Sequence, residues 1–360
     1  MSLQTRRRFL SHSAVAGVSA MGLRNTVAAD MHSKIRIGQI GTRHAHASGK
    51  IEAMRKLSDL FEVVGVVEPD SERRKQLAQS EAYRDLPWMT TEQLLNAEGL
   101  AAVAVETSVD ELVPTALLAV RAGKHVHLDK PAGTSMSEYR RLRREADERG
   151  LTIQMGYMLR YNPAFKRLFQ IIDDGWLGPL TELNAMMGKK ASASMRRELA
   201  QFAGGGMFEL ACHLIDAMVT ILGKPTEITA FNRRTKPDQD SFADSQIAIF
   251  EYPHLVATVR CNHLDPFGFA RREFTVVGEQ GYYQISPLET PRVELALDRA
   301  RGELLKGIQP LEFPKMTGRY DDEFRDFAGV IRGDYPLAWD SEHDLTVHEA
   351  ILRGSGMPVR

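Results

Sequence analysis

The chain has 360 residues, of which 43% are hydrophobic and 26% are charged, and its formal net charge at pH 7 is -1. This is ordinary globular composition, with room for two domains of about 100–200 residues each. The near-equal numbers of basic and acidic residues exclude the excess of basic residues that is expected of proteins that bind nucleic acid or anionic membranes. The two cysteines, Cys212 and Cys261, are too few for a disulfide framework. We expect two buried thiols; one disulfide bridge between them is the alternative.

The N-terminal segment, residues 1–29, is expected to be a twin-arginine signal peptide and not part of the fold. The pattern TRRRFL occupies residues 5–10, a mildly apolar stretch occupies 14–23, and small residues at 27–29 precede Asp30. Basic, apolar and small segments in this order are typical of an export signal. The apolar stretch is too short to span a bilayer stably. We expect a mature chain that begins at Asp30 and acts in the periplasm or another extracytoplasmic space; a disordered basic tail is the alternative.

Strands and helices alternate from residue 34 onward. Such alternation predicts βαβ units and, with right-handed crossovers, a doubly wound parallel sheet. We therefore predict an α/β fold that begins with a dinucleotide-binding Rossmann domain over residues 34–157. The expected strands are 34–40, 61–67, 101–105, 125–128 and 151–157, and the expected helices are 46–57, one beginning near 71, 91–98, 109–122 and 136–149.

The second half of the chain has strand candidates in close succession, bracketed by helices. This pattern predicts an α+β domain over residues 158–335 with a mostly antiparallel, open sheet, followed by a C-terminal helix region, 336–360, that packs back on the body. One open face of the sheet would suit a homo-oligomer. The expected strands are 180–188, 227–234, 245–252, 255–263, 272–277 and 282–286, and the expected helices are 162–175, 207–222 and 321–332.

Ligands of doubly wound sheets bind beyond the carboxyl ends of the strands. The first such turn reads GTRHAH, and of the three glycines in the G-x-G-x-x-G fingerprint only Gly41 is present. Arg43 and His46 replace the other two, while Thr42 and His44 lie between them. We interpret this turn as a cofactor site with an eroded signature; a plain βα turn fits as well.

Glu68 follows the second strand, 27 positions after Gly41. A carboxylate there accepts hydrogen bonds from ribose hydroxyls and repels a 2′-phosphate, which favours NAD over NADP. The nearby Arg43, Arg73 and Arg74 leave NADP open. The alternative role for Glu68 is a charge at a helix N-terminus, where the macrodipole stabilises it.

Several motifs follow one another along the chain in a specific order. They are HVHLDKP at 125–131, GYMLRYNP at 156–163, GWLG at 175–178, and the glycines 204–206 followed by Glu209, His213 and Asp216. Together they resemble the Gfo/Idh/MocA family (glucose-fructose oxidoreductase, inositol dehydrogenase, rhizopine catabolism). Their order and spacing cover nearly all of residues 34–350, and they are more specific than the eroded glycine turn.

The resemblance implies roles for the matching residues. Lys130 would lie between nicotinamide and the substrate hydroxyl, as general acid/base or as polariser of the alkoxide, with Pro131 after a cis bond. His213 would be the family's catalytic histidine. Glu209 stands where the family usually has Asp, and Asp129 where it usually has Glu.

Helical spacing leads to a similar hypothesis. Positions 209, 213 and 216 are i, i+4 and i+7 on a helix from 207, so Glu209, His213 and Asp216 would share one face. Flanking carboxylates would stabilise an imidazolium, which suits a proton acceptor in alcohol oxidation. The alternatives are a solvated polar face and, ranked last, a metal site; no metal is expected.

Two further segments complete the candidate site. Thr107 and Ser108 stand where the family often has T-P-N-x-x-H; their hydroxyls can still hydrogen-bond the cofactor. Tyr157, Arg160 and Asn162 follow the last strand of the first domain, where substrate contact or a structural Arg–carboxylate pair fits equally.

The charges at Lys189, Lys190, Arg196 and Arg197 are expected to be solvated or part of a mobile loop.

These observations favour an NAD(P)-dependent oxidoreductase that moves a hydride between nicotinamide and a secondary alcohol of a sugar, cyclitol or sugar derivative. Two alternatives remain. An NAD-dependent glycosidase would recycle its cofactor within each turnover, and a non-catalytic relative would bind cofactor or sugar without chemistry. We expect no nucleic-acid partner and no stable membrane span.

Overall fold

The computed structural model describes residues 33–289, 291–314 and 316–360. The twin-arginine segment and Asp30 lie outside the described residues. None of the helices in these ranges is both long and apolar enough to cross a membrane.

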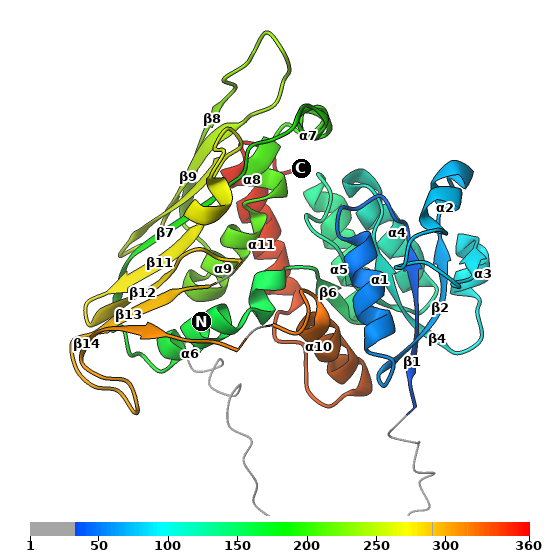
Figure 1. Cartoon of the computed structure of the whole chain (residues 1–360), viewed down its shortest axis with the longest axis horizontal. Helices are drawn as coiled ribbons and strands as arrows, with labels where there is room; N and C mark the ends of the chain where they lie inside the picture. The colour runs from blue at the N-terminus through cyan, green and yellow to red at the C-terminus, as the bar shows by residue number, and fades with distance from the viewer. Residues whose placement is uncertain (1–32, 290, 315) are drawn as a thin grey trace, which may run out of the picture.

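The first sheet is parallel, as predicted, and has six strands in the order β3-β2-β1-β4-β5-β6 (Figure 1). The two-residue β3 is not among the predicted strands. Its direction of growth reverses between β1 and β4, which makes the edge beyond these strands the expected ligand position. The strands are β1 (Ile35–Ile40), β2 (Phe61–Val67), β3 (Trp88–Met89), β4 (Leu100–Val105), β5 (His125–Leu128) and β6 (Ile153–Met155); the helices are α1 (Ala47–Lys56), α2 (Ser71–Leu77), α3 (Thr91–Leu95), α4 (Val109–Arg121) and α5 (Met136–Glu148).

The second sheet has eight strands in the order β14-β13-β12-β11-β7-β10-β9-β8, and only the β7–β10 pair is parallel. The predicted α/β class with a mostly antiparallel second sheet is therefore confirmed. The sequence did not predict β13 or the edge strand β14, where Pro310 interrupts the strand pattern. The strands are β7 (Leu180–Gly188), β8 (Glu227–Arg233), β9 (Ser245–Glu251), β10 (Val256–Asn262), β11 (Glu273–Gly278), β12 (Gly281–Ile285), β13 (Val293–Leu297) and β14 (Gly307–Leu311).

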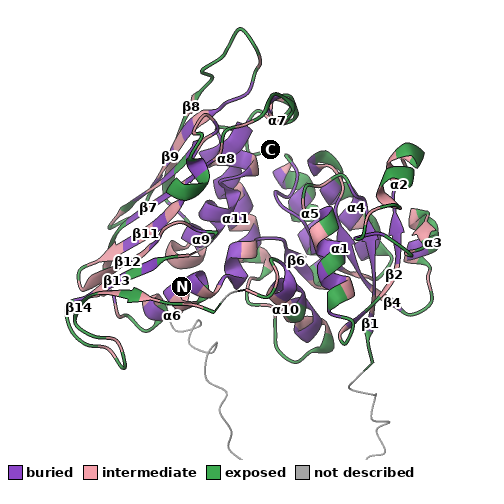
Figure 2. Cartoon of the chain, viewed as in Figure 1, coloured by how far each residue is buried: buried purple, intermediate pink, exposed green. Residues whose placement is uncertain are grey.

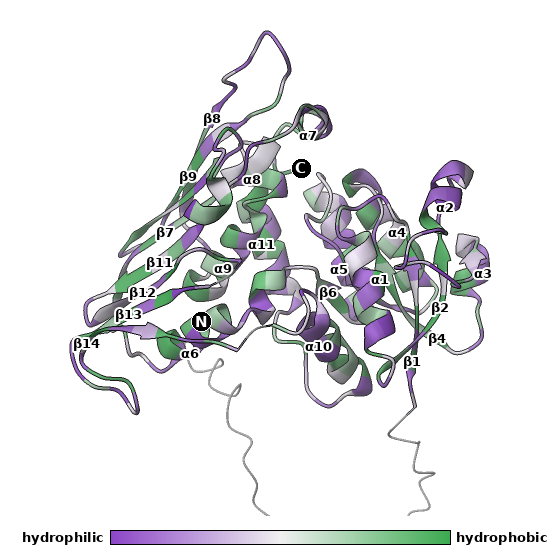
Figure 3. Cartoon of the chain, viewed as in Figure 1, coloured by the Kyte–Doolittle hydropathy of each residue, from purple (hydrophilic) through white to green (hydrophobic). Residues whose placement is uncertain are grey.

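Helices cover one face of the second sheet and leave the other face open. Figure 1 shows α6, α8, α9 and α11 between this sheet and the first domain. Side chains alternate between buried and partly exposed along β9 and β10, because successive residues point to opposite faces. Buried, intermediate and exposed residues follow one another along the strands of this sheet in Figure 2, and hydrophilic and hydrophobic residues both occur along them in Figure 3. The helices are α6 (Pro163–Asp173), α7 (Ala193–Leu199), α8 (Gly205–Glu209), α9 (Cys212–Leu222), α10 (Asp321–Arg332) and α11 (Ser341–Gly354), with a 3-10 turn at Met158–Tyr161.

Two C-terminal helices join the two halves. α10 returns to the first domain, where Phe324 and Phe327 pack in one core with Ile37 and Ile51. α11 contacts α5 on the first domain and α9 on the second. The carboxyl edge of the first sheet consequently faces α8 and α9 across a fixed junction.

Both cysteines are buried and free, as the simpler expectation had it.

Candidate active site

Lys130 lies at the carboxyl end of β5 and reaches the second domain. Its side chain is 1% exposed, and its Nζ donates to the Glu209 carbonyl oxygen at 2.7 Å and lies 3.3 Å from Glu209 Oε1. Burial disfavours the ammonium, but Glu209 outweighs it and raises the pKa of Lys130. The same contact helps hold the pKa of Glu209 at about 2 although burial alone would raise it. Lys130 is thus a fixed cation that can donate but not accept a proton near neutral pH. The Lys130–Pro131 bond is cis, as the resemblance implied.

The predicted continuous helix over 207–222 is wrong, and Lys130 contributes to the reason. α8 ends at Glu209 and α9 begins at Cys212. In a continuous helix the Glu209 carbonyl would accept from the N–H of His213. Here it accepts instead from Lys130 at 2.7 Å and from the Cys212 thiol at 3.2 Å. Tertiary contacts therefore end the helix where propensity would continue it.

His213 is brought to Lys130, but without the carboxylates expected on either side of it. It is 4% exposed, its Nδ1 has no hydrogen-bond partner, and its ring centroid lies 6.0 Å from that of Tyr157 and 6.5 Å from that of His46. Burial and then the Lys130 charge lower its pKa well below the usual range. The expected stabilised imidazolium is therefore wrong: His213 is a neutral imidazole.

Asp216 points away from His213 into a second group of charges. Arg160 donates to Asp216 from Nε at 3.1 Å and from Nη2 at 2.6 Å, and its Nη2 also donates to Asp344 at 2.6 Å. Arg143 forms an ion pair with Asp344 from the other side. We call these four residues (Arg143, Arg160, Asp216 and Asp344) the junction cluster. Each is at most 2% exposed.

The junction cluster matches the structural alternative for Arg160. The guanidinium carbon lies 4.9 Å from the Tyr157 ring centroid and 4.8 Å from that of Trp339, so aromatic faces cover the charge. Asn162 caps α6, because its side chain accepts from the N–H of Ala164 at 2.9 Å. Of the three predicted substrate residues after β6, only Tyr157 therefore contacts the group around His213.

The first βα turn keeps a geometry that fits a dinucleotide despite its lost glycines. Gly41 has φ +88°, and a Cβ there would lie 2.6 Å from the Thr107 side chain. The helices α1 and α4, which begin after the two central strands, have no side-chain cap, whereas Asp70, Thr90 and Ser135 cap α2, α3 and α5. Uncapped N–H groups and the positive helix end at the sheet's switch point suit a pyrophosphate. The residues present therefore fit the cofactor that the turn predicted.

Glu68 lies at the end of β2 in a small polar network. It accepts from the Thr42 hydroxyl at 2.5 Å and from the N–H of Asp70 at 3.0 Å, and it is 2% exposed. Arg73 reaches Thr42 from the other side, with Nε 2.7 Å from Oγ1. Arg43 is largely exposed and lies 3.2 Å from Asp70. A carboxylate and a guanidinium thus both stand where a ribose would arrive, so the site does not by itself separate NAD from NADP.

A second buried group, which we call the strand-edge cluster, lies beneath this turn. Its members are His44, His46, Lys50, Glu106, His127, Asp129 and Glu323. His44 Nδ1 and His46 Nδ1 lie 2.9 and 3.1 Å from Asp129 Oδ2, and Lys50 lies 3.2 Å from Glu323. Both Glu106 oxygens are buried without a hydrogen-bond partner. Burial and then the Asp129 charge raise the pKa of Glu106 well above its usual value.

The strand ends of the sequence pointed to His44, His46, Glu106 and Asp129 in this cluster, but Lys50, His127 and Glu323 were missed. The signal for two of them was a charged residue directly after an apolar strand, Glu106 after β4 and Asp129 after β5. Lys50 and Glu323 offered none, because a helix lysine and a helix glutamate are usually solvated.

The remaining predicted residues lie near this edge or beyond it. Thr107 donates from Oγ1 to the Ser108 carbonyl at 3.1 Å, and both residues are half-buried. Arg196 is not solvated: it is 6% exposed and bound to Asp240 and Asp244 at 2.7 and 2.9 Å.

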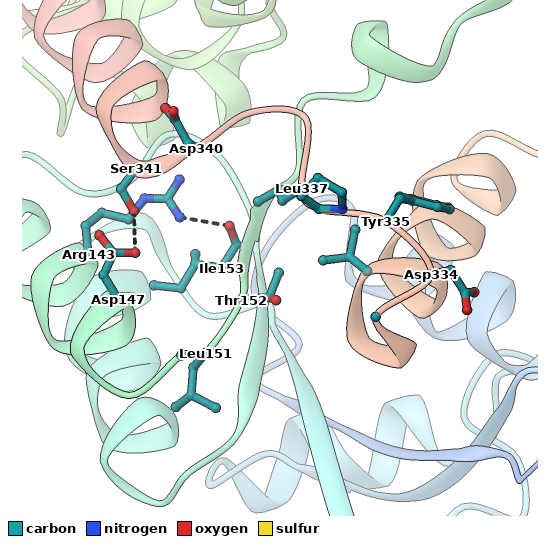
Figure 4. A pocket seen from close by; sticks show the side chains of 14 residues that line it. Arg143, Asp147, Leu151, Thr152, Ile153, Asp334, Tyr335, Leu337, Asp340 and Ser341 are labelled. Atoms are coloured by element: carbon teal, nitrogen blue, oxygen red, sulfur yellow. Dashed lines mark hydrogen bonds between the residues drawn. The ribbon is translucent and has the colours of Figure 1, made fainter. Parts of the chain in front are cut away.

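Figure 4 shows a depression elsewhere, between α5, β6 and the connection from α10 to α11. Ser341 donates to Asp147 at 2.8 Å and Arg143 donates to the Ile153 carbonyl at 2.8 Å within it. None of the predicted site residues lines this depression.

Known proteins match both halves of the chain. Residues 35–157 match the family described as "Oxidoreductase family, NAD-binding Rossmann fold", and residues 165–284 match "GFO/IDH/MocA C-terminal domain". A trans-1,2-dihydrobenzene-1,2-diol dehydrogenase of Bos taurus is 29% identical over 196 residues, which cover 53% of this chain and 57% of that relative. The match thus spans little more than half of the relative. The uncharacterized oxidoreductase YdgJ of Escherichia coli is 26% identical over 345 residues, covering 90% of this chain and 96% of YdgJ.

Solved structures share the whole arrangement. A UDP-N-acetylglucosamine 3-dehydrogenase from Acidithiobacillus ferrooxidans superposes with a TM-score of 0.74 at 20% identity, covering 90% of this chain and 97% of its own. KijD10, a 3-ketoreductase from Actinomadura kijaniata solved with TDP-benzene and NADP, gives 0.72 at 20% identity, covering 89% and 98%. At these identities the likeness shows the fold.

Proposed function

This chain belongs to the GFO/IDH/MocA oxidoreductase family, and on that premise we propose that it transfers a hydride between a nicotinamide cofactor and a secondary alcohol of a sugar, cyclitol or sugar derivative. The family assignment makes it an NAD(P)-binding oxidoreductase; the substrate class is our proposal. It is supported by two relatives of the same fold, named a UDP-N-acetylglucosamine 3-dehydrogenase and a 3-ketoreductase. The single observation that carries it is the buried Lys130 ammonium, 3.3 Å from Glu209 Oε1, beside the neutral His213.

The bound cofactor would supply the hydride acceptor or donor at C4 of its nicotinamide. The chain's own residues handle the charge and the proton. Lys130 is fixed by the Glu209 carbonyl and carboxylate, so its remaining N–H can point to a substrate oxygen and stabilise the alkoxide. His213 is neutral, so one ring nitrogen can accept the hydroxyl proton during oxidation. Both side chains are almost fully buried, which strengthens their interactions with a charge that develops between them.

For the cofactor we propose NAD, with Gly41, Thr42, His44, Thr107 and Ser108 around its phosphates and nicotinamide half. The buried Glu68 carboxylate supports this choice because it disfavours a 2′-phosphate. Mass spectrometry of the nucleotide that copurifies with the folded protein tests it, and copurified NADP would contradict it.

The test of the reaction is turnover on a panel of pyranoses, polyols and cyclitols with NAD⁺ and NADP⁺, followed as nicotinamide reduction. Lys130→Met should lower kcat by about 10²–10⁴-fold, because it removes the acid while leaving the cleft apolar and filled. Cofactor affinity should change far less. Lys75→Met is the matched control, since Lys75 is exposed on α2 and should be silent.

Unchanged turnover in Lys130→Met, or absence of nicotinamide binding by the wild type, would refute the proposal. Hydrolysis of an aryl glycoside without net NADH formation would favour the glycosidase alternative.

Two further proposals concern the chain's setting. The open face of the second sheet supports a homo-oligomer, which sedimentation velocity would reveal as a mass above that of one 40.3 kDa chain. The twin-arginine pattern at residues 5–10 supports export. Lys-Lys replacement of Arg6 and Arg7 should retain the protein in the cytoplasm, as fractionation would show.

A further inference from the structure

The strand-edge cluster brings three potential metal ligands together at the end of β1 and β5. His44, His46 and Asp129 offer ligand atoms that all lie within 4.8 Å of one another. The Nδ1 atoms of His44 and His46 lie 2.9 and 3.1 Å from the same oxygen, Asp129 Oδ2. Ligand atoms around one tetrahedral zinc ion are about 3–3.5 Å apart, given Zn–N and Zn–O bonds near 2 Å. The two histidine–carboxylate pairs are therefore near the spacing of a metal site, and the two histidines are no more than 4.8 Å apart; the His46–Asp129 pair is also at hydrogen-bond distance.

The hydrogen bonds of His44 leave a lone pair facing a carboxylate. Its Nε2 lies 3.0 Å from the Lys130 carbonyl oxygen, which can only accept, so Nε2 must carry a hydrogen. In the neutral ring Nδ1 is then bare, and it accepts weakly from the N–H of His46 at 3.4 Å. This bare nitrogen also faces Asp129 Oδ2 at 2.9 Å. Two lone pairs at this distance repel unless a cation lies between them. A histidine whose second nitrogen donates to a backbone carbonyl is the usual arrangement of a metal ligand.

Glu106 adds an independent observation. It is fully buried, both of its oxygens lack a hydrogen-bond partner, and Oε2 lies 3.8 Å from His44 Nδ1. A buried carboxyl group in a folded protein is paired, coordinates a metal or takes up a proton. Glu106 thus lies beside His44 with both of its oxygens unpartnered.

The charged groups of the strand-edge cluster also favour a bound cation. Asp129, Glu106 and Glu323 contribute three negative charges when ionised, and Lys50, at 0% exposure, contributes one positive charge. The cluster thus has two more carboxyl groups than ammonium groups. Lys130 does not offset this difference, since it is paired with Glu209. A bound cation would offset it.

We propose that His44, His46 and Asp129 bind a divalent first-row transition metal of the zinc class, with Glu106 as fourth ligand or as partner of a bound water. Two imidazoles and a carboxylate suit Zn²⁺ and disfavour Mg²⁺, which requires a shell of oxygen ligands. The metal would tie the glycine-poor turn after β1 to the end of β5. It would thereby fix the backbone of Lys130, whose carbonyl is the partner of His44. The site does not depend on the proposed reaction.

Zinc titration of the untagged, full-length protein, stripped with EDTA, tests the proposal. Metal content after gel filtration should approach one zinc per chain, and the thermal midpoint should rise with zinc but not with Mg²⁺. Co²⁺ in place of zinc should give the visible absorption of a tetrahedral cobalt site. These readouts do not require catalysis, so a failed activity assay and a failed metal site are distinguishable.

Variants assign the site to these residues. His44→Ala with His46→Ala should abolish stoichiometric binding, and Glu106→Gln should weaken it about 10–100-fold. His254→Ala removes an exposed histidine outside the cluster and serves as the control. It should bind zinc as the wild type does. Circular dichroism without metal checks that each variant is folded. Absence of bound zinc in the wild type, or undiminished binding in the double variant, would overturn the proposal and leave a proton as the cation between His44 and Asp129.

Discussion

The junction cluster and the strand-edge cluster are both deeply buried, yet they are built in opposite ways. The junction cluster has two arginines and two aspartates, and its arginines sit against carboxylates or aromatic rings. The strand-edge cluster has three carboxylates and one lysine, and it contains Glu106 with two unpartnered oxygens. One group has equal numbers of arginines and aspartates, whereas the other has more carboxyl groups than ammonium groups and lies among histidines.

This difference separates two uses of buried charge. A buried pair with good geometry is strongly damaged by the loss of one member, which leaves the other charge uncompensated. A buried group whose charges are not paired and whose pKa values are shifted is expected where a ligand or a reaction supplies the opposite charge. The junction cluster therefore belongs to the architecture, and the strand-edge cluster to the site beside Lys130.

Arg160→Met should have the largest effect on folding. It leaves Asp344 with Arg143 and Asp216 with His343, 3.8 Å away, so we expect the free energy of unfolding to fall by about 3–5 kcal/mol. Denaturant unfolding measures it. Arg141→Met is the control, since Arg141 makes an exposed pair with Glu145 on α5 and should cost at most about 1 kcal/mol. Adding Asp216→Leu to Arg160→Met should recover part of the loss; a double variant that is weaker than the single one would contradict the paired nature of this cluster.

His348→Phe tests whether an unpaired imidazole, and not the ion pairs, makes the junction sensitive to pH. His348 on α11 is 0% exposed, both ring nitrogens lack partners, and burial lowers its pKa to about 3. Its folded pKa lies below the unfolded value of about 6.5, so its neutral form stabilises the fold above that pH. As pH falls from 6.5 towards 3 this contribution is lost, at about 1.4 kcal/mol per pH unit.

In His348→Phe this loss should disappear. The free energies of unfolding at pH 6.5 and 4.5 should differ by about 2 kcal/mol less than in the wild type, because the unfolded imidazole is already half protonated at pH 6.5. An equal pH dependence in both proteins would show that His348 is not the titrating group.

Glu106→Gln should have the smallest effect and the opposite sign to Arg160→Met. The folded pKa of Glu106 is raised, so above the unfolded value of about 4.3 its burial costs stability. An uncharged amide of the same shape removes that cost, and unfolding in EDTA at pH 7 should require about 1–2 kcal/mol more. Asp344→Asn in the junction cluster is the matched carboxylate-to-amide change and should destabilise. A loss of stability in both variants would erase the distinction between the clusters.

The sequence predicted most of the fold because local patterns and global topology agree in it. A run of β-branched residues marked β2, an apolar run marked β4, and the motif at 125–131 located Lys130 at a strand end. The helix at 207–222 was predicted wrongly for a physical reason: its break depends on an ammonium 79 positions away. No local window contains that contact.

The site was predicted less completely than the fold. Lys130, Glu209 and His213 do meet, but the spacing argument assigned Asp216 to the wrong partner. Arg160 takes it from 56 positions away. Lys50 and Glu323, 273 positions apart, form a buried pair that neither helix pattern indicates. The periodicity of a sequence does not show which charged residues pair across long separations in the chain.

The junction cluster also has a consequence for the lifetime of the folded state. Arg160 and Asp344 are 184 positions apart, so their contact closes only after the second domain has been synthesised and docked. A contact that forms this late is absent from the rate-limiting step of folding, and its stabilisation then appears as slower unfolding. The arginines and aspartates at the junction would set how long the assembled chain survives, while leaving the speed of its assembly almost unchanged.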